Sequence, residues 1–407
     1  MSSSFSPPLR PGASPRGRLI LCFAAFISLG LPDGLLGVAW PSIRADFGQP
    51  LDALGLVLIV GTTGYMLSSF FCGMLLRRFG IGGLLSLSCG ATGASLAVFG
   101  TTTWWWLVVV FAWALGLGAG AIDAALNTYV AKQHSARAMQ WMHAFFGVGV
   151  SLGPLIMTGG LALTGDWRLG YLIVGGAQGL LALTFLVTRG RWRTQRPATE
   201  VNVRESATVP LRSTLRRLPA ILGMVAFFLY VGVELGLGLW AFSFLTGARG
   251  VGTEVAGLIT GSYWATFTVG RILAGWFTAH FSVRTVLRAS LALAATGLLI
   301  LLLDAGPGLA VAGFALTGLA VAPFFPALMS DTRDRVGLDH EANTIGMQIA
   351  AAGLGAALVP ALAGVCARHF GLGILPLFML TALALLALCL AWAHRSSSRF
   401  STPQEAS

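Results

Sequence analysis

Charge is scarce in this chain. Charged residues make up 10% of its 407 residues, whereas hydrophobic residues make up 56%. A soluble globular domain carries about 25% charged residues. The composition therefore excludes an ordinary soluble enzyme or binding domain and indicates an integral protein of a lipid bilayer.

Lysine is almost absent, because Lys132 is the one lysine among 26 basic residues. Most of the arginines lie in short gaps between apolar runs. This distribution is the positive-inside pattern of a membrane protein and not a basic stripe, so we expect no nucleic-acid partner. The arginine-rich usage suits a bacterium with GC-rich codons, and we expect the bacterial plasma (inner) membrane.

The chain also lacks the signatures of disulfide, metal and catalytic sites. Its five cysteines lie in apolar runs, and none belongs to a C-x-x-C pair. Neither a nucleophile–base spacing nor a phosphate-binding loop nor a cluster of metal ligands stands out. We therefore expect neither an enzyme nor a bound metal.

Long apolar runs are what the chain has in abundance. A membrane-spanning helix needs about 20 predominantly apolar residues. The first run continues too far, and too many similar runs follow it, for a cleaved signal peptide. The twelve predicted spans are 19–40, 53–76, 82–101, 104–131, 141–164, 169–188, 220–246, 255–279, 285–304, 309–330, 342–366 and 371–393.

The apolar and polar segments predict five parts. They are an N-terminal tail (1–18), a six-helix half (19–188), a linker (189–219), a second six-helix half (220–393) and a C-terminal tail (394–407). The side that holds the termini and the linker collects 21 basic residues, and the other side collects four. Both termini and the linker are therefore predicted to be cytoplasmic, and both tails are predicted to be disordered.

An internal repeat relates the two halves. At an offset of 202 residues, segment 52–81 aligns without gaps on segment 254–283, and Gly73 falls on Gly275. Parallel repeats around an axis along the membrane normal, with a site between them, form one known transporter architecture. The predicted fold is an all-α membrane protein with twelve transmembrane helices in two parallel six-helix repeats.

Three of the fifteen acidic residues, Asp33, Asp123 and Glu234, lie deep inside spans. Intramembrane carboxylates are costly and usually functional, so capping of a helix end is a weak alternative at this depth. The offset of 202 takes Asp33 to Leu235, one residue from Glu234. Burial penalises the charged form of a carboxyl group, so binding a proton changes which conformation is favoured.

The stretch around Asp33 combines glycine with proline. Gly30, Gly34 and Gly37 would let neighbouring helices approach closely, and Pro32 favours a bend. In the fourth span Asn127 follows Asp123 at i+4, which places both side chains on one helix face. Small residues at 116, 120 and 124 form a packing edge of the same helix.

Other polar and aromatic side chains accompany the acids. A histidine at a span start is equally well explained as a cap, and aromatic residues often form interface belts or packing. The residues that we predict to contact a solute are Asn127, His143, Trp240, Gln348 and Tyr230.

These features resemble the major facilitator superfamily. Segment 73–83, GMLLRRFGIGG, is similar to the superfamily motif G-x-x-x-D-R-x-G-R-R between spans two and three. Gly73, Arg78 and Gly80 match, but Arg77 stands where the motif has Asp, so the charge contact of that Asp is not implied. The resemblance implies a monomer that transports a small-molecule substrate.

Shorter motifs resemble the fucose–galactose–proton symporter subfamily. They are IDAALNTYVA around Asp123 and FFLYVGVELGLGLW around Glu234. This resemblance implies that Asp123 is the protonatable carboxylate of span four and that Asp33 is the family's aspartate of span one. Glu234 and His143 stand where the fucose permease has amides, which leaves the substrate open.

The sequence therefore supports two functions. The first is a proton-coupled symporter of a sugar or similar small polar solute, with the proton as coupling ion and no other cofactor. Asp123 would carry the proton and Asp33 would couple it to the solute. Glu234, the third proton-coupling carboxylate, would also hydrogen-bond hydroxyls of the solute. The alternative is a proton-coupled exporter of amphipathic compounds or drugs, which uses the same fold. A membrane sensor without transport is a third reading.

Overall fold

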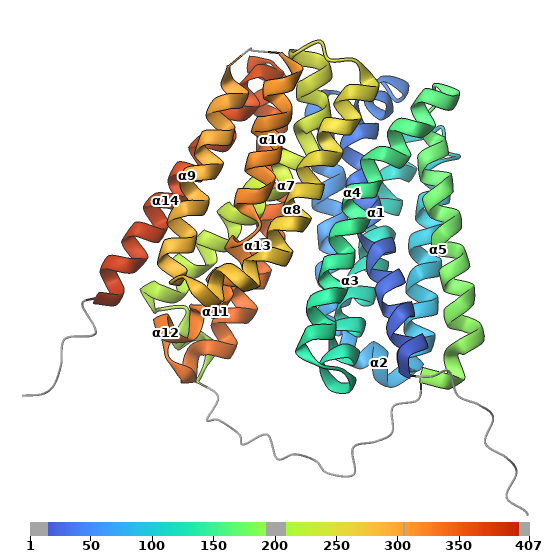
Figure 1. Cartoon of the computed structure of the whole chain (residues 1–407). Helices are drawn as coiled ribbons and strands as arrows, with labels where there is room; N and C mark the ends of the chain where they lie inside the picture. Colours follow the sequence, from blue (N-terminus) through green and yellow to red (C-terminus); the bar gives the residue numbers. More distant parts are fainter. Residues whose placement is uncertain (1–14, 193–208, 304–305, 399–407) are drawn as a thin grey trace, which may run out of the picture.

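The computed structural model describes residues 15–192, 209–303 and 306–398, which are helical almost throughout. The long helices form two groups, one on each side of the molecule (Figure 1). The first group is α1 (Pro15–Asp46), α2 (Leu54–Phe99), α3 (Trp105–Gln133), α4 (Ala136–Thr164) and α5 (Arg168–Thr188). The second group is α7 (Leu218–Ala248), α8 (Thr253–His280), α9 (Val283–Leu302), α10 (Pro307–Val321), α11 (Phe324–Ser330), α13 (Leu338–Phe370) and α14 (Leu375–Ser398). The short elements are η1 (Leu51–Ala53), η2 (Arg189–Trp192), α6 (Leu211–Thr214), α12 (Thr332–Val336) and η3 (Leu372–Ile374).

Within the described residues, ten helices are long and apolar enough to cross a membrane. One of them, Leu51–Phe99, contains two predicted spans that meet at Gly80, where a positive φ of 65° turns the chain. Helix α8 is not among the ten, because Arg271 and several Thr, Ser and Gly residues lower its hydropathy. Helices α10 and α11 together form one span. Counted in this way, the helices agree with the predicted twelve spans, six in each half.

The ends of the two groups explain how the halves are joined. Helices α1 and α7 begin, and helices α5 and α14 end, at the lower end of the molecule in Figure 1. This is expected, because a half with an even number of spans begins and ends on the same side of the membrane. Residues 1–14, 193–208 and 399–407 of the predicted tails and linker lie outside the described residues. Helix α1 begins at Pro15 and α14 continues to Ser398, so the tail residues next to these helices are helical and not disordered as predicted.

The internal repeat reappears in the packing. A Cβ atom added at Gly116 of α3 would lie 1.9 Å from the Gly61 carbonyl oxygen, and one at Gly318 of α10 would lie 2.3 Å from the Tyr263 carbonyl oxygen. Both members of this contact are shifted by 202 residues, so the predicted offset holds for these spans. The close approach of two helix backbones at small residues is a common way to pack membrane helices.

The first spans of the two halves follow a slightly different offset. A Cβ atom at Gly149 of α4 would meet the Ile27 carbonyl oxygen at 2.0 Å, and one at Gly355 of α13 would meet the Phe228 carbonyl oxygen at 2.1 Å. Ile27 and Phe228 are 201 residues apart. Asp33 and Glu234 are also 201 residues apart, so the two carboxylates occupy equivalent positions in α1 and α7.

The predicted close packing around Asp33 is confirmed. A Cβ atom at Gly34 would lie 2.4 Å from the Val150 carbonyl oxygen of α4, and one at Gly37 would lie 2.7 Å from the Leu239 carbonyl oxygen of α7. Helix α1 continues without interruption through Pro32. Asp33 is therefore held on a helix that packs against both halves.

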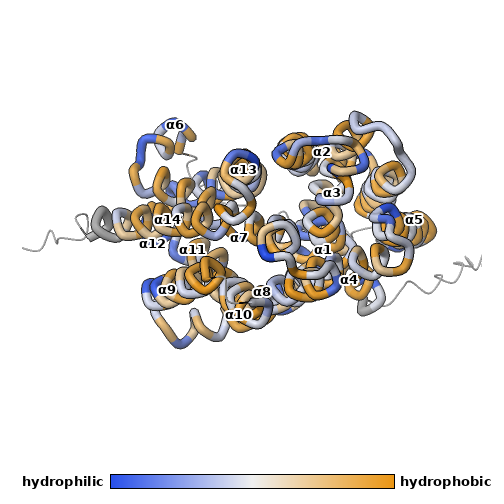
Figure 2. The backbone as a smooth tube through the Cα atoms, turned by 90° about the horizontal axis from the view of Figure 1, so that it is seen from above, coloured by the Kyte–Doolittle hydropathy of each residue, from blue (hydrophilic) through white to orange (hydrophobic). Residues whose placement is uncertain are grey.

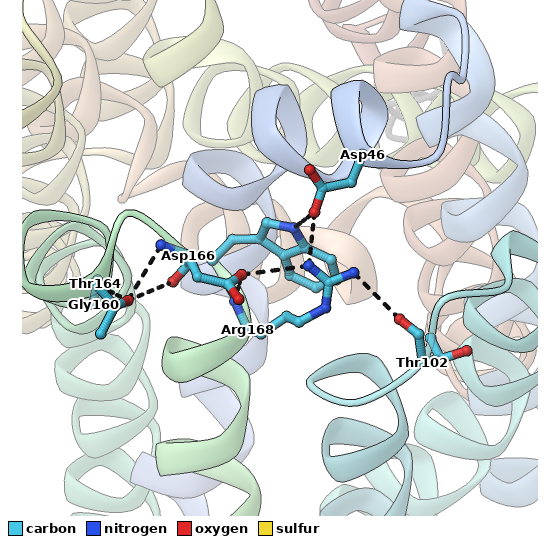
Figure 3. Close-up of polar contacts among 7 residues, drawn as sticks. Asp46, Thr102, Gly160, Thr164, Asp166 and Arg168 are labelled. Carbon is cyan, nitrogen blue, oxygen red and sulfur yellow. Dashed lines mark hydrogen bonds and ion pairs between the residues drawn. The ribbon is translucent and has the colours of Figure 1, made fainter.

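Polar contacts at the upper end tie the first half together (Figure 3). Arg168 Nη1 lies 2.7 Å from Asp46 Oδ2 and 3.4 Å from Asp166 Oδ1, and Arg168 Nη2 donates to the Thr102 carbonyl oxygen at 3.3 Å. The Trp167 indole donates to the same Asp46 oxygen at 2.7 Å. These contacts join the end of α1 to the α2–α3 and α4–α5 connections, which favours movement of this half as one body.

The two halves meet at the upper end. Arg368 Nη1 of α13 lies 3.0 Å and 3.2 Å from the two Asp52 carboxylate oxygens of η1. Small residues pack nearby, because a Cβ atom at Gly55 would lie 2.7 Å from Ala361 Cβ and one at Gly257 would meet Thr158 Oγ1 at 1.9 Å. The helices of the halves diverge toward the lower end, and α1, α4, α7 and α8 lie where the halves face each other (Figures 1 and 2).

Candidate functional site

Asp123 of α3 is the centre of a chain of hydrogen bonds in the first half. The Tyr65 hydroxyl of α2 donates to Asp123 Oδ2. Asn127 Nδ2 donates to Asp123 Oδ1 at 2.8 Å and to the Asp123 carbonyl oxygen at 2.9 Å. The i+4 spacing thus brings Asp123 and Asn127 together as predicted. Tyr65 was not predicted, because nothing in the sequence links it to a residue 58 positions away.

His143 of α4 extends this chain. Its Nε2 atom lies 3.1 Å from Asn127 Oδ1, and the ring packs edge-on against Phe26 of α1 with 5.3 Å between centroids. With the amide oriented by its bond to Asp123, Asn127 Oδ1 is an acceptor, so His143 donates from Nε2. The imidazole is exposed. The predicted capping alternative is wrong, because α4 begins at Ala136 and its N-cap is Ser135, whose side chain accepts from the Ala138 amide.

Asp33 of α1 differs from Asp123, because its carboxylate has no hydrogen bond or ion pair with another residue in the described part of the chain. The side chain is exposed. It lies within electrostatic range of Tyr65, the residue that donates to Asp123. Asp33 and Asp123 therefore belong to one electrostatic group, which lacks a basic ion-pair partner among the described residues.

Glu234 of α7 lies in a compact cluster of the second half. The Tyr230 hydroxyl donates to Glu234 Oε2, and Arg271 Nη2 of α8 lies 3.5 Å from the same oxygen. Arg271 Nη2 also donates to the Tyr230 hydroxyl oxygen at 3.1 Å. The Tyr263 hydroxyl donates to the Glu234 carbonyl oxygen at 2.6 Å. Tyr230 thus lies beside Glu234, whereas its predicted contact with the solute stays a prediction.

Arg271 is a site residue that the sequence did not single out as a ligand. Its guanidinium carbon lies 4.7 Å from the centroid of the Phe267 ring and 5.5 Å from that of the Phe325 ring. The side chain is 27% exposed, and its Nε atom is buried without a hydrogen-bond partner. Arg271 also lies within electrostatic range of His143, in the opposite half. The feature of the sequence that could have identified Arg271 is the position of an arginine inside a predicted span, 255–279.

Trp240 and Gln348 lie apart from both clusters. The Trp240 indole is 2% exposed and donates to the Pro360 carbonyl oxygen at 2.9 Å. Gln348 is 4% exposed and accepts a hydrogen bond from Thr332 Oγ1 at 3.1 Å. It packs against Gly223, which is eleven residues, or roughly 16 Å along the helix, from Glu234. The predicted solute contacts of both residues stay predictions without support from this geometry.

The two halves therefore differ in charge at equivalent positions. Asp33 and Glu234 are repeat mates, but among the described residues Glu234 has a cation beside it and Asp33 has none. The repeat mate of Arg271 at the offset of 202 is Ser69, whose hydroxyl donates to the Gly120 carbonyl oxygen at 3.2 Å. The described residues contain no group of three or more His, Cys, Asp or Glu side chains that could hold a metal ion. The arrangement suits proton binding in one half and polar recognition in the other.

Known sequences are similar along most of the chain. "Bypass of stop codon protein 6" of Saccharomyces cerevisiae is 25% identical over 91% of this chain and 81% of its own length. The glucose/mannose transporter GlcP of Bacillus subtilis is 22% identical over 77% of this chain and 79% of its own. The sodium-dependent glucose transporter 1A of Mus musculus is 22% identical over 86% and 89%, respectively.

Solved structures share the fold at lower identity. The nucleoside transporter NupG superposes with a TM-score of 0.77 at 13% identity, over 92% of this chain and 99% of its own. A D-xylose–proton symporter superposes with a TM-score of 0.74 at 16% identity, over 92% and 97%. The sequence profile of the Major Facilitator Superfamily matches residues 21–256 and, a second time, residues 241–406. With twelve spans in two repeated halves and a profile that covers nearly all of it, the chain belongs to the Major Facilitator Superfamily of membrane transporters.

Proposed function

We propose that this transporter is a proton-coupled symporter of a sugar or similar small polar solute. In this proposal it is a monomer in the plasma (inner) membrane of a bacterium, with both termini in the cytoplasm. The observation that carries the proposal is the pair of carboxylates, Asp33 and Asp123, neither of which has an ion-pair partner among the described residues. Groups of this kind, next to the boundary between two movable halves, are suited to bind and release a coupling proton.

The solute class is supported by the relatives. GlcP is named for glucose and mannose, the mouse relative is named for glucose, and one structural neighbour is named for D-xylose and a proton. The side chains gathered at the site are carboxylates, an amide, an imidazole, a guanidinium and phenols. Such groups match the hydroxyls of a sugar better than the apolar surface of a drug, which favours the symporter over the exporter.

The proposed cycle uses proton binding to allow the halves to rock. In this structure the halves meet at the upper end and diverge toward the lower end, which the basic-residue pattern assigns to the cytoplasm. Closing the lower end removes water from Asp33 and Asp123, which is unfavourable while they are charged. A proton at Asp123 and a solute near Asp33 would lower that barrier. Asn127 and His143 would then bind solute hydroxyls or relay the proton.

Uptake by purified protein in liposomes tests this function. We expect an inward proton gradient to drive accumulation of at least one labelled sugar among D-glucose, D-mannose and D-xylose, and a protonophore to abolish it. A sodium gradient at constant pH serves as the matched control, because one relative is named as sodium-dependent. Accumulation that follows sodium alone would refute proton coupling, and the absence of any sugar uptake would refute the solute class.

A further inference from the structure

The Arg271–Glu234 cluster has hydrogen-bonding groups to spare. Arg271 Nη2 serves both Tyr230 and Glu234, whereas no described residue bonds to Nη1, which is not among the buried atoms of the side chain. Tyr230 and Arg271 both contact Oε2 of Glu234, and no described residue bonds to Oε1. The Arg271 side chain is 27% exposed, so a ligand oxygen that reaches Nη1 would complete the hydrogen bonds of the guanidinium.

The cluster is also held in a fixed position. Phe267 and Phe325 pack against the guanidinium, and Tyr230 stacks on Phe324 with 5.4 Å between ring centroids. The Tyr263 hydroxyl anchors the α7 backbone at Glu234. A planar guanidinium fixed in this way presents its donors in a set direction, which a flexible lysine would not do.

We propose that Arg271 and Glu234 together bind neighbouring hydroxyl groups of the solute and select against acidic solutes. The inference rests on the proposed sugar transport and names the class of sugar: uncharged hexoses and pentoses, not sugar acids. A hydroxyl oxygen accepts from Arg271 Nη1, and a neighbouring hydroxyl donates to Glu234 Oε1. Neither residue alone offers both a donor and an acceptor of this strength.

The charge of the pair decides the selectivity. A lone arginine in a cavity attracts carboxylates, and this is a common way to bind acids. Here Glu234 cancels the charge of Arg271, and a solute carboxylate would also face Glu234 as a like charge. Ser69 stands at the equivalent place in the first half, so the pair is a feature of the second half alone.

Equilibrium binding of D-glucose and D-glucuronate to the purified protein tests the proposal without any gradient. The two sugars differ by one carboxylate on the same ring. We expect the wild type to prefer D-glucose. In Glu234→Gln the arginine is left uncompensated, so we expect binding of D-glucose to weaken about tenfold and the glucuronate-to-glucose affinity ratio to rise at least about tenfold.

Two further variants separate this effect from misfolding. The double variant Glu234→Gln/Arg271→Gln restores neutrality, and we expect it to lose the gain in glucuronate binding. Glu254→Gln is the matched control, because Glu254 is exposed in the first turn of α8, and its ratio should equal that of the wild type.

Several results of these binding measurements would overturn the inference. A wild type that binds glucuronate as tightly as glucose, or binds neither sugar, overturns the inference. An unchanged ratio in Glu234→Gln, or the same gain in the double variant, does so as well. Gradient-driven uptake in liposomes is independent of these ratios, so failure of proton coupling would be seen there and not here.

Discussion

Replacing Asp123 by asparagine separates proton binding from the hydrogen-bond network. The carboxylate accepts from Asn127 through Oδ1 and from Tyr65 through Oδ2. An asparagine keeps one oxygen that accepts from Asn127, and its amide group can donate to a Tyr65 hydroxyl that rotates to accept. Because both contacts survive, we expect the free energy of unfolding to change by no more than about 1 kcal/mol.

The effect on transport should be much larger. One pH unit across the membrane stores about 1.4 kcal/mol per proton, so one coupled proton supports roughly tenfold accumulation. Without a titratable group at this position we expect the accumulation ratio in liposomes to fall to about one, while solute exchange at equal pH persists.

The assay compares Asp123→Asn with Asp334→Asn, an exposed carboxylate at the lower end, which should accumulate solute as the wild type does. Thermal unfolding of both variants checks that the fold is intact. Tenfold accumulation by Asp123→Asn would remove Asp123 from the coupling mechanism. A large loss of stability would refute the hydrogen-bond argument instead.

Three other changes give further tests. Asp33→Asn should impair gradient-driven accumulation while exchange survives, measured by counterflow, and normal accumulation would exclude a coupling role. Gly116→Val should lower stability by about 1–3 kcal/mol in thermal unfolding because its side chain meets the α2 backbone, whereas Gly159→Ala, which has open space, should not. Asp52→Asn removes the ion pair with Arg368, whose side chain is 51% exposed, and exposed ion pairs contribute little free energy. In spin-label distance measurements we therefore expect the population of conformers closed at the upper end to fall by at most about fivefold. An increase in that population would contradict this role.

The twelve-span architecture could be predicted from the sequence because a lipid bilayer requires long apolar helices. Span length, arginine placement and the offset of 202 each depend on local composition, and the packing at Gly116 and Gly318 agrees with that offset. The offset of 202 placed Asp33 within one residue of Glu234, and the contacts of Gly149 and Gly355 were needed to show that the offset of the first spans is 201.

The site was accessible only in part. Asp123 and Asn127 were paired because i+4 neighbours share a helix face, but contacts between helices depend on rotation about each helix axis, which composition does not set. Tyr65 and Arg271 join their carboxylates through such contacts. For the same reason Trp240, which lies about 1.7 helical turns from Glu234, points into the packing of its own half.

The single counter-ion in the second half has an electrical consequence. Because Arg271 cancels Glu234, the carboxylates of Asp33 and Asp123 are the charges of the candidate site that have no ion-pair partner among the described residues. A potential of 100 mV changes the free energy of moving one elementary charge across the membrane by about 2.3 kcal/mol. In the proposed cycle the protonated carrier with a neutral solute moves less charge than the empty carrier. An interior-negative potential would therefore act mainly on the return of the empty carrier and speed it toward the outside.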